Sequence, residues 1–275
     1  MEDEHEGDGH GTQPVERRLM SKNRCALDLT PPDHAGTIVA EADIEAVPED
    51  WARALAVVAH PDDMEYGAAS AIARWTDQGK DVAYVLVTSG EAGISTRPPA
   101  EVAPLREAEQ RASCAAVGVS DVTFLGLPDG LVVADLALRG ALAAAIRRHR
   151  PDVVVSINFR DSWGGSSWNH VDHRSVGVAL LDAVRDAANP WLFPAAGPAW
   201  PGVRFAAFSG SPAAGHGVDI TDHLARGVDS LRAHAAYLDG LGGDGDPTAF
   251  LNEAARSFGP RLGVELATPF ELVTF

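Results

Sequence analysis

The first candidate for chemistry is the stretch AHPDD at 59–63, which follows the apolar run LAVV at 55–58. Proline ends the ladder pairing of a strand and adjacent acids repel each other, so strand or helix propensity gives little reason for this cluster. His60, Asp62 and Asp63 offer one nitrogen and two oxygen ligands, a set that suits zinc or a similar divalent ion. The stretch therefore indicates a cation site.

A second cluster follows the apolar run DVVVSI at 152–157. His170 and His173 stand three residues apart at the start of a predicted helix, so both can face the same side. Each cluster alone has an ordinary explanation, since Asp62 or Asp63 could cap a helix and single histidines often pack or face water. Together, at neighbouring strand ends, the two clusters predict a metal site.

The elements that must position these residues alternate along the chain from Trp51 onward. Valine-rich runs predict strands at 55–59, 82–88, 121–125, 152–157 and 203–208, with a late strand within 264–274. Helical patterns lie near 67–79, 104–117, 135–150, 172–187, 222–238 and 248–258. This alternation predicts an α/β fold, a doubly wound, mainly parallel, Rossmann-like sheet with helices on both faces. In that strand order the first and fourth strands lie side by side, which brings the two clusters together.

Composition limits the remaining possibilities. Residues 1–50 are acidic and punctuated by glycine and proline, so we expect a poorly ordered tail, with His5 and His10 solvated, before a single domain at 51–275. The 22 Lys and Arg against 39 Asp and Glu give a net charge of −17 without a compensating basic run. This balance argues against nucleic acid or an anionic membrane surface as a partner.

Cysteine usage and hydropathy predict the compartment. Cys25 and Cys114 are the two cysteines, and their spacing fits neither a disulfide framework nor a zinc-thiolate site. The chain shows no apolar core of a signal peptide and no uninterrupted apolar stretch of about 18 residues. We therefore expect a cytoplasmic protein without a transmembrane segment.

The motifs resemble the PIG-L/LmbE family of zinc-dependent N-acetylglucosaminyl deacetylases over most of residues 54–275. The resemblance is carried by AHPDD at 59–63, TSGEAG at 88–93, Arg106 with Glu109, LGLPDG at 125–130, HVDH at 170–173 and VDITDHL at 218–224 followed by Ala233 and His234. It implies that His60, Asp63 and His173 hold one zinc ion per chain, or another divalent ion in its place.

The resemblance also implies roles for neighbouring side chains. Asp62 would act as the general base, and His170, if protonated, would stabilise the oxyanion. Asp172 would orient an imidazole. Glu91 would either reach the same pocket or support its own loop.

Two further residues are expected to bind sugar hydroxyls by the same resemblance, Arg106 and Asp129. Each has a plain structural alternative. Arg106 and Glu109 could form a surface pair on a helix, and PDG at 128–130 is a good turn sequence.

The implied substrate is a small molecule or glycoconjugate that carries N-acetylglucosamine. Four tryptophans lie in glycine- and proline-rich loops after the second cluster, at Trp163, Trp168, Trp191 and Trp200. They either pack in the core or form an apolar rim around the pocket. A rim would suit a bulky aglycone, and on this ground we favour a glycopeptide antibiotic pseudoaglycone over a glucosaminyl-inositol compound or another amide.

Two other classes of function compete with a deacetylase. A metal-dependent hydrolase of another bond, such as a phosphoester, often uses two metals and needs more ligands. The remaining histidines of the predicted domain occur singly, at His149, His216, His223 and His234, which favours one metal. A non-catalytic sugar- or metal-binding protein would gain little from an uncoordinated Asp62 beside the ion.

Overall fold

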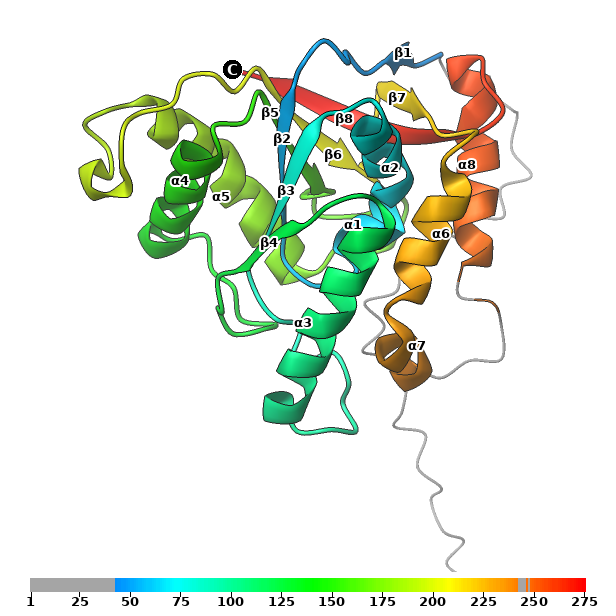
Figure 1. Cartoon of the computed structure of the whole chain (residues 1–275), viewed down its shortest axis with the longest axis horizontal. Coiled ribbons are helices and arrows are strands. Elements are labelled where there is room, and N and C mark those ends of the chain that lie inside the picture. Colours follow the sequence, from blue (N-terminus) through cyan, green and yellow to red (C-terminus); the bar gives the residue numbers. More distant parts are fainter. Residues whose placement is uncertain (1–42, 242–245, 247) are drawn as a thin grey trace, which may run out of the picture.

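The computed structural model describes residues 43–241, 246 and 248–275, and in this part of the chain the centre is a single eight-stranded sheet (Figure 1). The strands are β1 Glu45–Ala46, β2 Arg53–Val58, β3 Asp81–Leu86, β4 Asp121–Phe124, β5 Val153–Ile157, β6 Phe205–Ser209, β7 His216–Asp219 and β8 Ala267–Thr274. Their order in space is β1-β7-β8-β6-β5-β2-β3-β4. Neighbouring strands are parallel except where β8 pairs with β6 and β7.

Helices cover both faces of this sheet. They are α1 Asp63–Gly67, α2 Ala69–Asp77, α3 Pro99–Ala116, α4 Leu136–His149, α5 Val171–Ala188, α6 Leu224–Arg232, α7 Ala235–Leu241 and α8 Ala249–Leu262, with a 3₁₀ turn at Pro194–Ala196. Helices α4 and α5 lie on one side, and α2, α3, α6 and α8 lie on the other (Figure 1). The predicted doubly wound α/β architecture is confirmed.

The apolar run that forms β2 supplies both layers of the core. Ala56 and Val58 pack with the helices around α2, whereas Leu55 and Val57 pack with α4 and α5. Successive strand residues point to opposite faces, so a strand covered on both sides must be apolar throughout. Pro61 then follows the strand at its carboxyl end.

Strand order reverses between β2 and β5. The chain winds from β2 to β3 and β4 in one direction and from β5 to β6 in the other. Strand β2 pairs in parallel with β5, with Leu55 opposite Val154. The loops that follow these two strands therefore meet at the sheet edge, which is where open α/β sheets bind ligands.

Three features differ from the sequence expectation. The sheet begins before residue 50, because β1 pairs with β7 and Ile44 and Val47 are buried. A two-residue strand is too short to give a hydrophobic pattern. The predicted helix at 222–238 is divided into α6 and α7 at Ala233 and His234, and β7 was not predicted. The predicted tail up to residue 42, with His5 and His10, lies outside the described residues.

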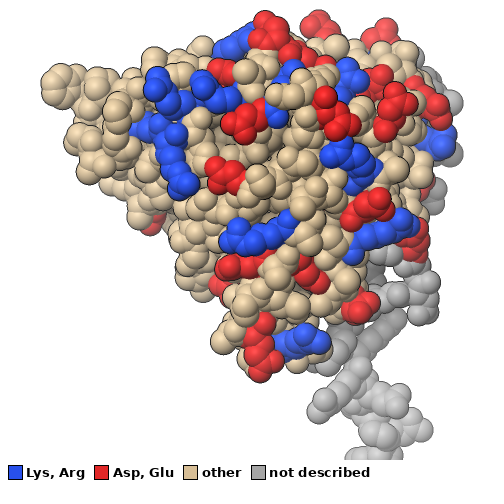
Figure 2. All heavy atoms as spheres, viewed as in Figure 1, with Lys and Arg blue, Asp and Glu red and all other residues tan. Residues whose placement is uncertain are grey.

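Surface charge is mixed on the face shown in Figure 2, where basic and acidic side chains are interspersed. Among the described residues, each helix is too short or too polar to cross a membrane.

Candidate metal centre

Three ligand atoms from two loops converge at the carboxyl ends of β2 and β5. His60 Nδ1 lies 3.1 Å from His173 Nε2. Asp63 Oδ1 lies 3.1 Å from the same His173 nitrogen and 3.6 Å from His60 Nδ1. Ligand atoms of a tetrahedral ion with bonds of about 2.0–2.2 Å stand about 3.3–3.6 Å apart. The predicted triad therefore has the spacing of a metal site.

The hydrogen bonds of both imidazoles direct their lone pairs to this point. His60 Nε2 lies 3.1 Å from Asp129 Oδ1 and 3.2 Å from Asp172 Oδ2, so this nitrogen carries the proton. His173 Nδ1 lies 3.0 Å from Asn169 Oδ1 and donates to it. His60 Nδ1 and His173 Nε2 are then both acceptors, and Asp63 adds a third. Three facing acceptors repel each other unless a cation lies between them, so the residues fit a divalent ion.

Charge leads to the same conclusion. Four carboxylates surround His60 and its neighbours, those of Asp62, Asp63, Asp129 and Asp172, and each side chain is at most 8% exposed. One guanidinium, Arg106, offsets them. Burying unpaired carboxylates costs several kcal/mol each, which a bound cation removes.

Potential ligand atoms form two overlapping groups in the described residues: His60 with His170 and His173, and His60 with Asp129 and Asp172. We place the ion on the His173 side, because Asp129 and Asp172 hold the Nε2 proton of His60. Since both groups share His60, the described residues supply one centre.

The two adjacent acids have opposite pKa shifts. Burial raises the pKa of Asp62 above its ordinary value, and the nearby Arg106 only partly opposes this rise. Burial acts in the same direction on Asp63, but His173 and His60 hold the pKa of Asp63 far below its ordinary value. Separated pKa values in neighbouring acids suit different roles: Asp63 stays ionised, as a metal ligand must be, and Asp62 can accept a proton.

Arg106 forms a buried ion pair with Asp62. Its Nη2 atom is 2.9 Å from Asp62 Oδ2, an ion pair without good hydrogen-bond alignment, and the guanidinium also donates to the carbonyls of Pro61 and Gly90. The guanidinium carbon stands 3.8 Å from the centre of the Tyr237 ring. Arg106 is buried, so the alternative of a surface pair with a neighbouring acid is wrong. Its predicted contact with sugar stays a prediction.

Asp129 lies at the turn predicted for residues 128–130, yet its side chain reaches His60. Its Oδ2 atom accepts the Ala92 N–H at 2.8 Å, and its own N–H donates to Glu91 Oε1 at 2.9 Å. Glu91 thus supports the loop.

Asp172 holds the loop that follows β4 against the centre. Its two oxygens accept the N–H groups of Gly130 at 2.7 Å and Val132 at 3.0 Å, in addition to His60. Asp172 thus contacts the His60 ring, and its role in orienting that imidazole stays a prediction.

His170 is the N-cap of α5. Its Nδ1 atom accepts the Asp172 N–H at 3.2 Å, so the neutral ring carries its proton on Nε2. Burial lowers the pKa of His170, and the neighbouring His60 and His173 lower it further. A neutral His170 can still donate a hydrogen bond, so donation does not require the protonated form expected from sequence.

The four tryptophans do not act as one group. Trp163 stands 5.9 Å from His173 between ring centres, beside the site. Trp168 is 68% exposed, whereas Trp200 is partly buried and donates to the Pro151 carbonyl. Trp191 is 86% exposed and follows the far end of α5. An 18-residue helix is about 27 Å long, so Trp191 is remote from the site.

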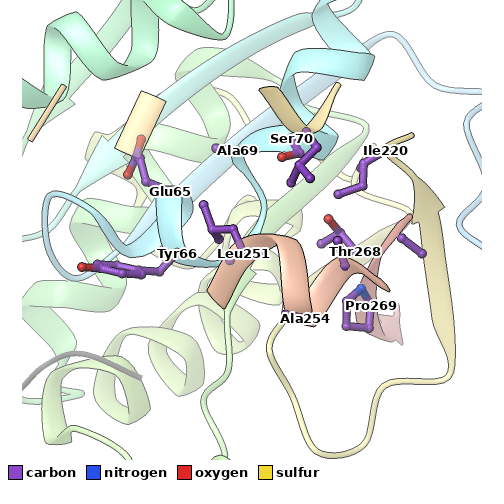
Figure 3. A pocket seen from close by; sticks show the side chains of 13 residues that line it. Glu65, Tyr66, Ala69, Ser70, Ile220, Leu251, Ala254, Thr268 and Pro269 are labelled. Atoms are coloured by element: carbon purple, nitrogen blue, oxygen red, sulfur yellow. The ribbon is translucent and has the colours of Figure 1, made fainter. Parts of the chain in front are cut away.

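Two hollows lie near the centre. One, of about 280 Å³, is lined by Ser89, Glu91, Pro99, Ala100, Ala103, Gly126 and Leu127. It adjoins the Asp129 loop through Glu91. The other, of about 40 Å³, has Glu65 and Tyr66 in its lining with Thr268 and Pro269 (Figure 3). The second is too small for a sugar.

Sequence reasoning missed two buried polar residues of the site, Asn169 and Gln110. Asn169 fixes His173, as described above. Gln110 Oε1 accepts the Asp62 N–H at 3.0 Å. Asn169 directly precedes the HVDH motif, and this position could have marked it as a site residue. Gln110 is one of many polar residues on a helix, so its sequence position gives no such signal.

Comparisons with known proteins agree with the geometry. The sequence model of the PIG-L family, described as GlcNAc-PI de-N-acetylase, matches residues 55–184. Diacetylchitobiose deacetylase of Thermococcus kodakarensis is 31% identical over 143 residues, which cover 51% of this chain and 52% of that protein. The chain thus spans about half the length of this relative.

A second relative matches over a longer region. The 1D-myo-inositol 2-acetamido-2-deoxy-alpha-D-glucopyranoside deacetylase of Actinosynnema mirum is 30% identical over 250 residues, which cover 70% of this chain and 84% of that protein. Among solved structures, N,N'-diacetylchitobiose deacetylase from Pyrococcus horikoshii superimposes with a TM-score of 0.73 at 24% identity, covering 82% of this chain and 85% of that one. This last likeness establishes the fold.

Proposed function

Because this chain belongs to the PIG-L family, we propose that it is a metal-dependent amide hydrolase that removes the acetyl group from an N-acetylglucosaminyl compound. The observation that carries this proposal is the set of three acceptors from His60, Asp63 and His173, with the Asp62 carboxylate beside them and bound to none of the three. We assign zinc as the ion, because two imidazoles and a carboxylate in tetrahedral spacing suit it.

The residues around the ion divide the chemistry. A divalent ion held by the triad would act as a Lewis acid toward the amide carbonyl and would make a water molecule more acidic. Asp62 accepts the proton of the attacking water and returns it to the amine nitrogen as the carbon–nitrogen bond breaks. His170 donates its Nε2 proton in a hydrogen bond to the oxygen that becomes negative. Arg106 keeps the Asp62 carboxylate in place.

We infer the substrate class from the side chains that surround the candidate metal centre. Leu131, Trp168 and Val171 are exposed apolar side chains, which we call the apolar collar. Leu131 lies between the two residues whose N–H groups bind Asp172, and Val171 directly precedes Asp172. A small polar sugar does not need such a surface. We therefore propose a bulky, partly apolar aglycone, with a glycopeptide pseudoaglycone as the favoured example.

The relatives named above act, by their names, on diacetylchitobiose and on an acetamido-glucopyranoside of inositol. The hollow of about 280 Å³ beside Asp129 has room for a group attached to the sugar, so a polyhydroxylated aglycone is the second candidate. The two candidates place the aglycone against different residues, the apolar collar or the lining of this hollow.

A panel assay tests both levels of the proposal. Zinc-loaded protein would be incubated with N-acetylglucosamine, its inositol glycoside, diacetylchitobiose and an N-acetylglucosaminylated glycopeptide, and loss of an acetyl group would be followed by mass spectrometry. We expect deacetylation that Asp62→Asn slows by about 10²- to 10⁴-fold. If no compound loses an acetyl group, the proposed activity is wrong.

Variants of the apolar collar then test which aglycone the protein accepts. Trp168→Ala should raise KM for the glycopeptide by about 10-fold, which corresponds to about 1.4 kcal/mol of lost contact. Trp191→Ala, at the remote and more exposed tryptophan, should leave KM unchanged. A preference for the inositol glycoside that Trp168→Ala does not alter would contradict the apolar aglycone.

A further inference from the structure

We propose that Gln110 is a positioning residue that holds Asp62 in a left-handed backbone conformation and so places the carboxylate for its role as a base. This inference rests on the proposed function and adds a residue outside the family motifs that the sequence carries.

Asp62 has an unusual backbone. Its φ is 88° and its ψ is −18°, in the left-handed region that non-glycine residues seldom adopt. Among the described residues, Asp62 shares a positive φ only with Arg150, Phe193 and a set of glycines. Such a conformation is disfavoured for a residue with a side chain and persists where the surroundings impose it.

The conformation separates two adjacent carboxylates. Asp62 precedes α1 at its N-cap position, but its side chain caps no N–H group. Instead it faces Arg106, whereas the next side chain, Asp63, faces His60 and His173. With Asp62 in an ordinary extended or helical conformation, the two side chains would leave the chain in different directions from these. The strained residue therefore allows one acid to bind the ion and the other to remain free.

The backbone N–H of Asp62 is held by one side chain. It donates to Gln110 Oε1 at 3.0 Å. An N–H group can only donate, so the oxygen of the Gln110 amide must face it, and this fixes which way the amide points. The Gln110 NH₂ group then faces Glu65 Oε1 at 2.9 Å and Cys114 Sγ at 3.3 Å.

The side chains that hold Gln110 in place are also buried and hydrogen-bonded. Glu65 Oε1 accepts the Ser113 hydroxyl at 2.7 Å in addition to Gln110. Gln110, Ser113 and Cys114 lie within four residues of one another on α3. All three side chains are buried. Glu65 Oε1 accepts from both Ser113 and Gln110, and Gln110 Oε1 accepts from the Asp62 N–H, so these hydrogen bonds fix one orientation of the Gln110 amide.

Removing the Gln110 amide should lower turnover and leave the ion and the substrate in place. Gln110→Met keeps the length of the side chain but leaves the buried Asp62 N–H without a hydrogen-bond acceptor. We expect kcat to fall by about 10- to 100-fold, on the scale of one lost buried hydrogen bond, with KM and zinc stoichiometry unchanged. Gln78→Met, at an exposed glutamine that ends α2, is the control and should keep the wild-type kcat.

A reciprocal exchange separates positioning from general damage. Gln110→Glu alone places a carboxylate against Glu65 and should lose activity. Combined with Glu65→Gln, it restores an acceptor for the Asp62 N–H and a donor between the two side chains, so the double variant should recover most of kcat. Failure of this rescue in a folded, zinc-loaded protein would overturn the proposal.

A double-mutant cycle shows whether Gln110 acts through Asp62. In the Asp62→Asn background, Gln110→Met should change the residual turnover by less than about twofold, because the base is already absent. An equal loss in both backgrounds would refute a role through Asp62.

A crystal structure of Gln110→Met decides the backbone claim without an activity assay. We expect Asp62 to leave the φ 88° conformation. If Asp62 keeps that conformation, the proposal is wrong whatever reaction the protein performs. If wild type deacetylates nothing while Asp62 moves in the variant, the proposed function fails and the structural role of Gln110 stands.

Discussion

Replacing Arg106 by methionine should destabilise the protein by about 3–5 kcal/mol, because it leaves the buried Asp62 carboxylate without its cation. The two side chains are 3% and 6% exposed and 2.9 Å apart, so water cannot replace the lost partner. For a domain of this size, such a loss lowers Tm by about 6–20 °C. Arg204→Met is the control, since Arg204 pairs with Asp50 at 2.9 Å and these side chains are 45% and 72% exposed. We expect that change to cost far less than Arg106→Met, because water screens an exposed pair and solvates the partner that remains.

The pairwise part of this effect can be isolated by a double-mutant cycle. Wild type, Arg106→Met, Asp62→Asn and the double variant would be unfolded in urea at saturating zinc. The double variant should be more stable than the sum of the single losses indicates, by about 1–3 kcal/mol. A cost for Arg106→Met no greater than that for Arg204→Met, or single losses that simply add, would refute a stabilising buried ion pair between Arg106 and Asp62.

Three further outcomes follow from the same contacts. Asp62→Asn should retain zinc, measured by elemental analysis, while kcat falls by about 10²- to 10⁴-fold, and a wild-type rate would exclude Asp62 as the base. Asn169→Ala removes the acceptor of the His173 Nδ1 proton and should weaken zinc binding by about 10- to 100-fold in a chelator competition, with Asn189→Ala as an exposed control. Burial raises the pKa of Glu49, but hydrogen bonds from Arg74, Gln78 and Trp75 bring it below the ordinary 4.5. A lowered folded-state pKa means that the stabilisation is present above the unfolded value and is lost as pH falls through the folded one. The unfolding free energy of wild type should therefore decline more steeply below about pH 4.5 than that of Glu49→Gln, and parallel pH profiles would show that these bonds add nothing.

The sheet and the convergence of the two polar clusters could be predicted from the sequence for a simple reason. A strand covered on both faces must be apolar throughout, so LAVV and DVVVSI are visible as strands. Each is followed at once by its polar cluster, and the rule that ligands bind where strand order reverses placed the clusters together. The pairing of β2 with β5 confirms this step.

Helix α3 shows where sequence reasoning stopped. Arg106, Glu109 and Gln110 form a polar face that is buried against the loop after β2 and against α7. A hydrophobic pattern assigns such a face to solvent, because the pattern records polarity and not partners. The contact of Asp129 with His60 was missed for a related reason, since it depends on the path of a turn and not on residue type.

The position of the metal is the most direct test of this account. Crystals of the zinc-loaded protein would be measured at the zinc absorption edge, and an anomalous difference map would locate the ion. We expect one peak per chain, bonded to His60 Nδ1, to Asp63 Oδ1 and to His173 Nε2, with the Asp62 carboxylate outside the coordination sphere. A peak on the other side of His60, between Asp129 and Asp172, or a pair of bridged peaks, would contradict it.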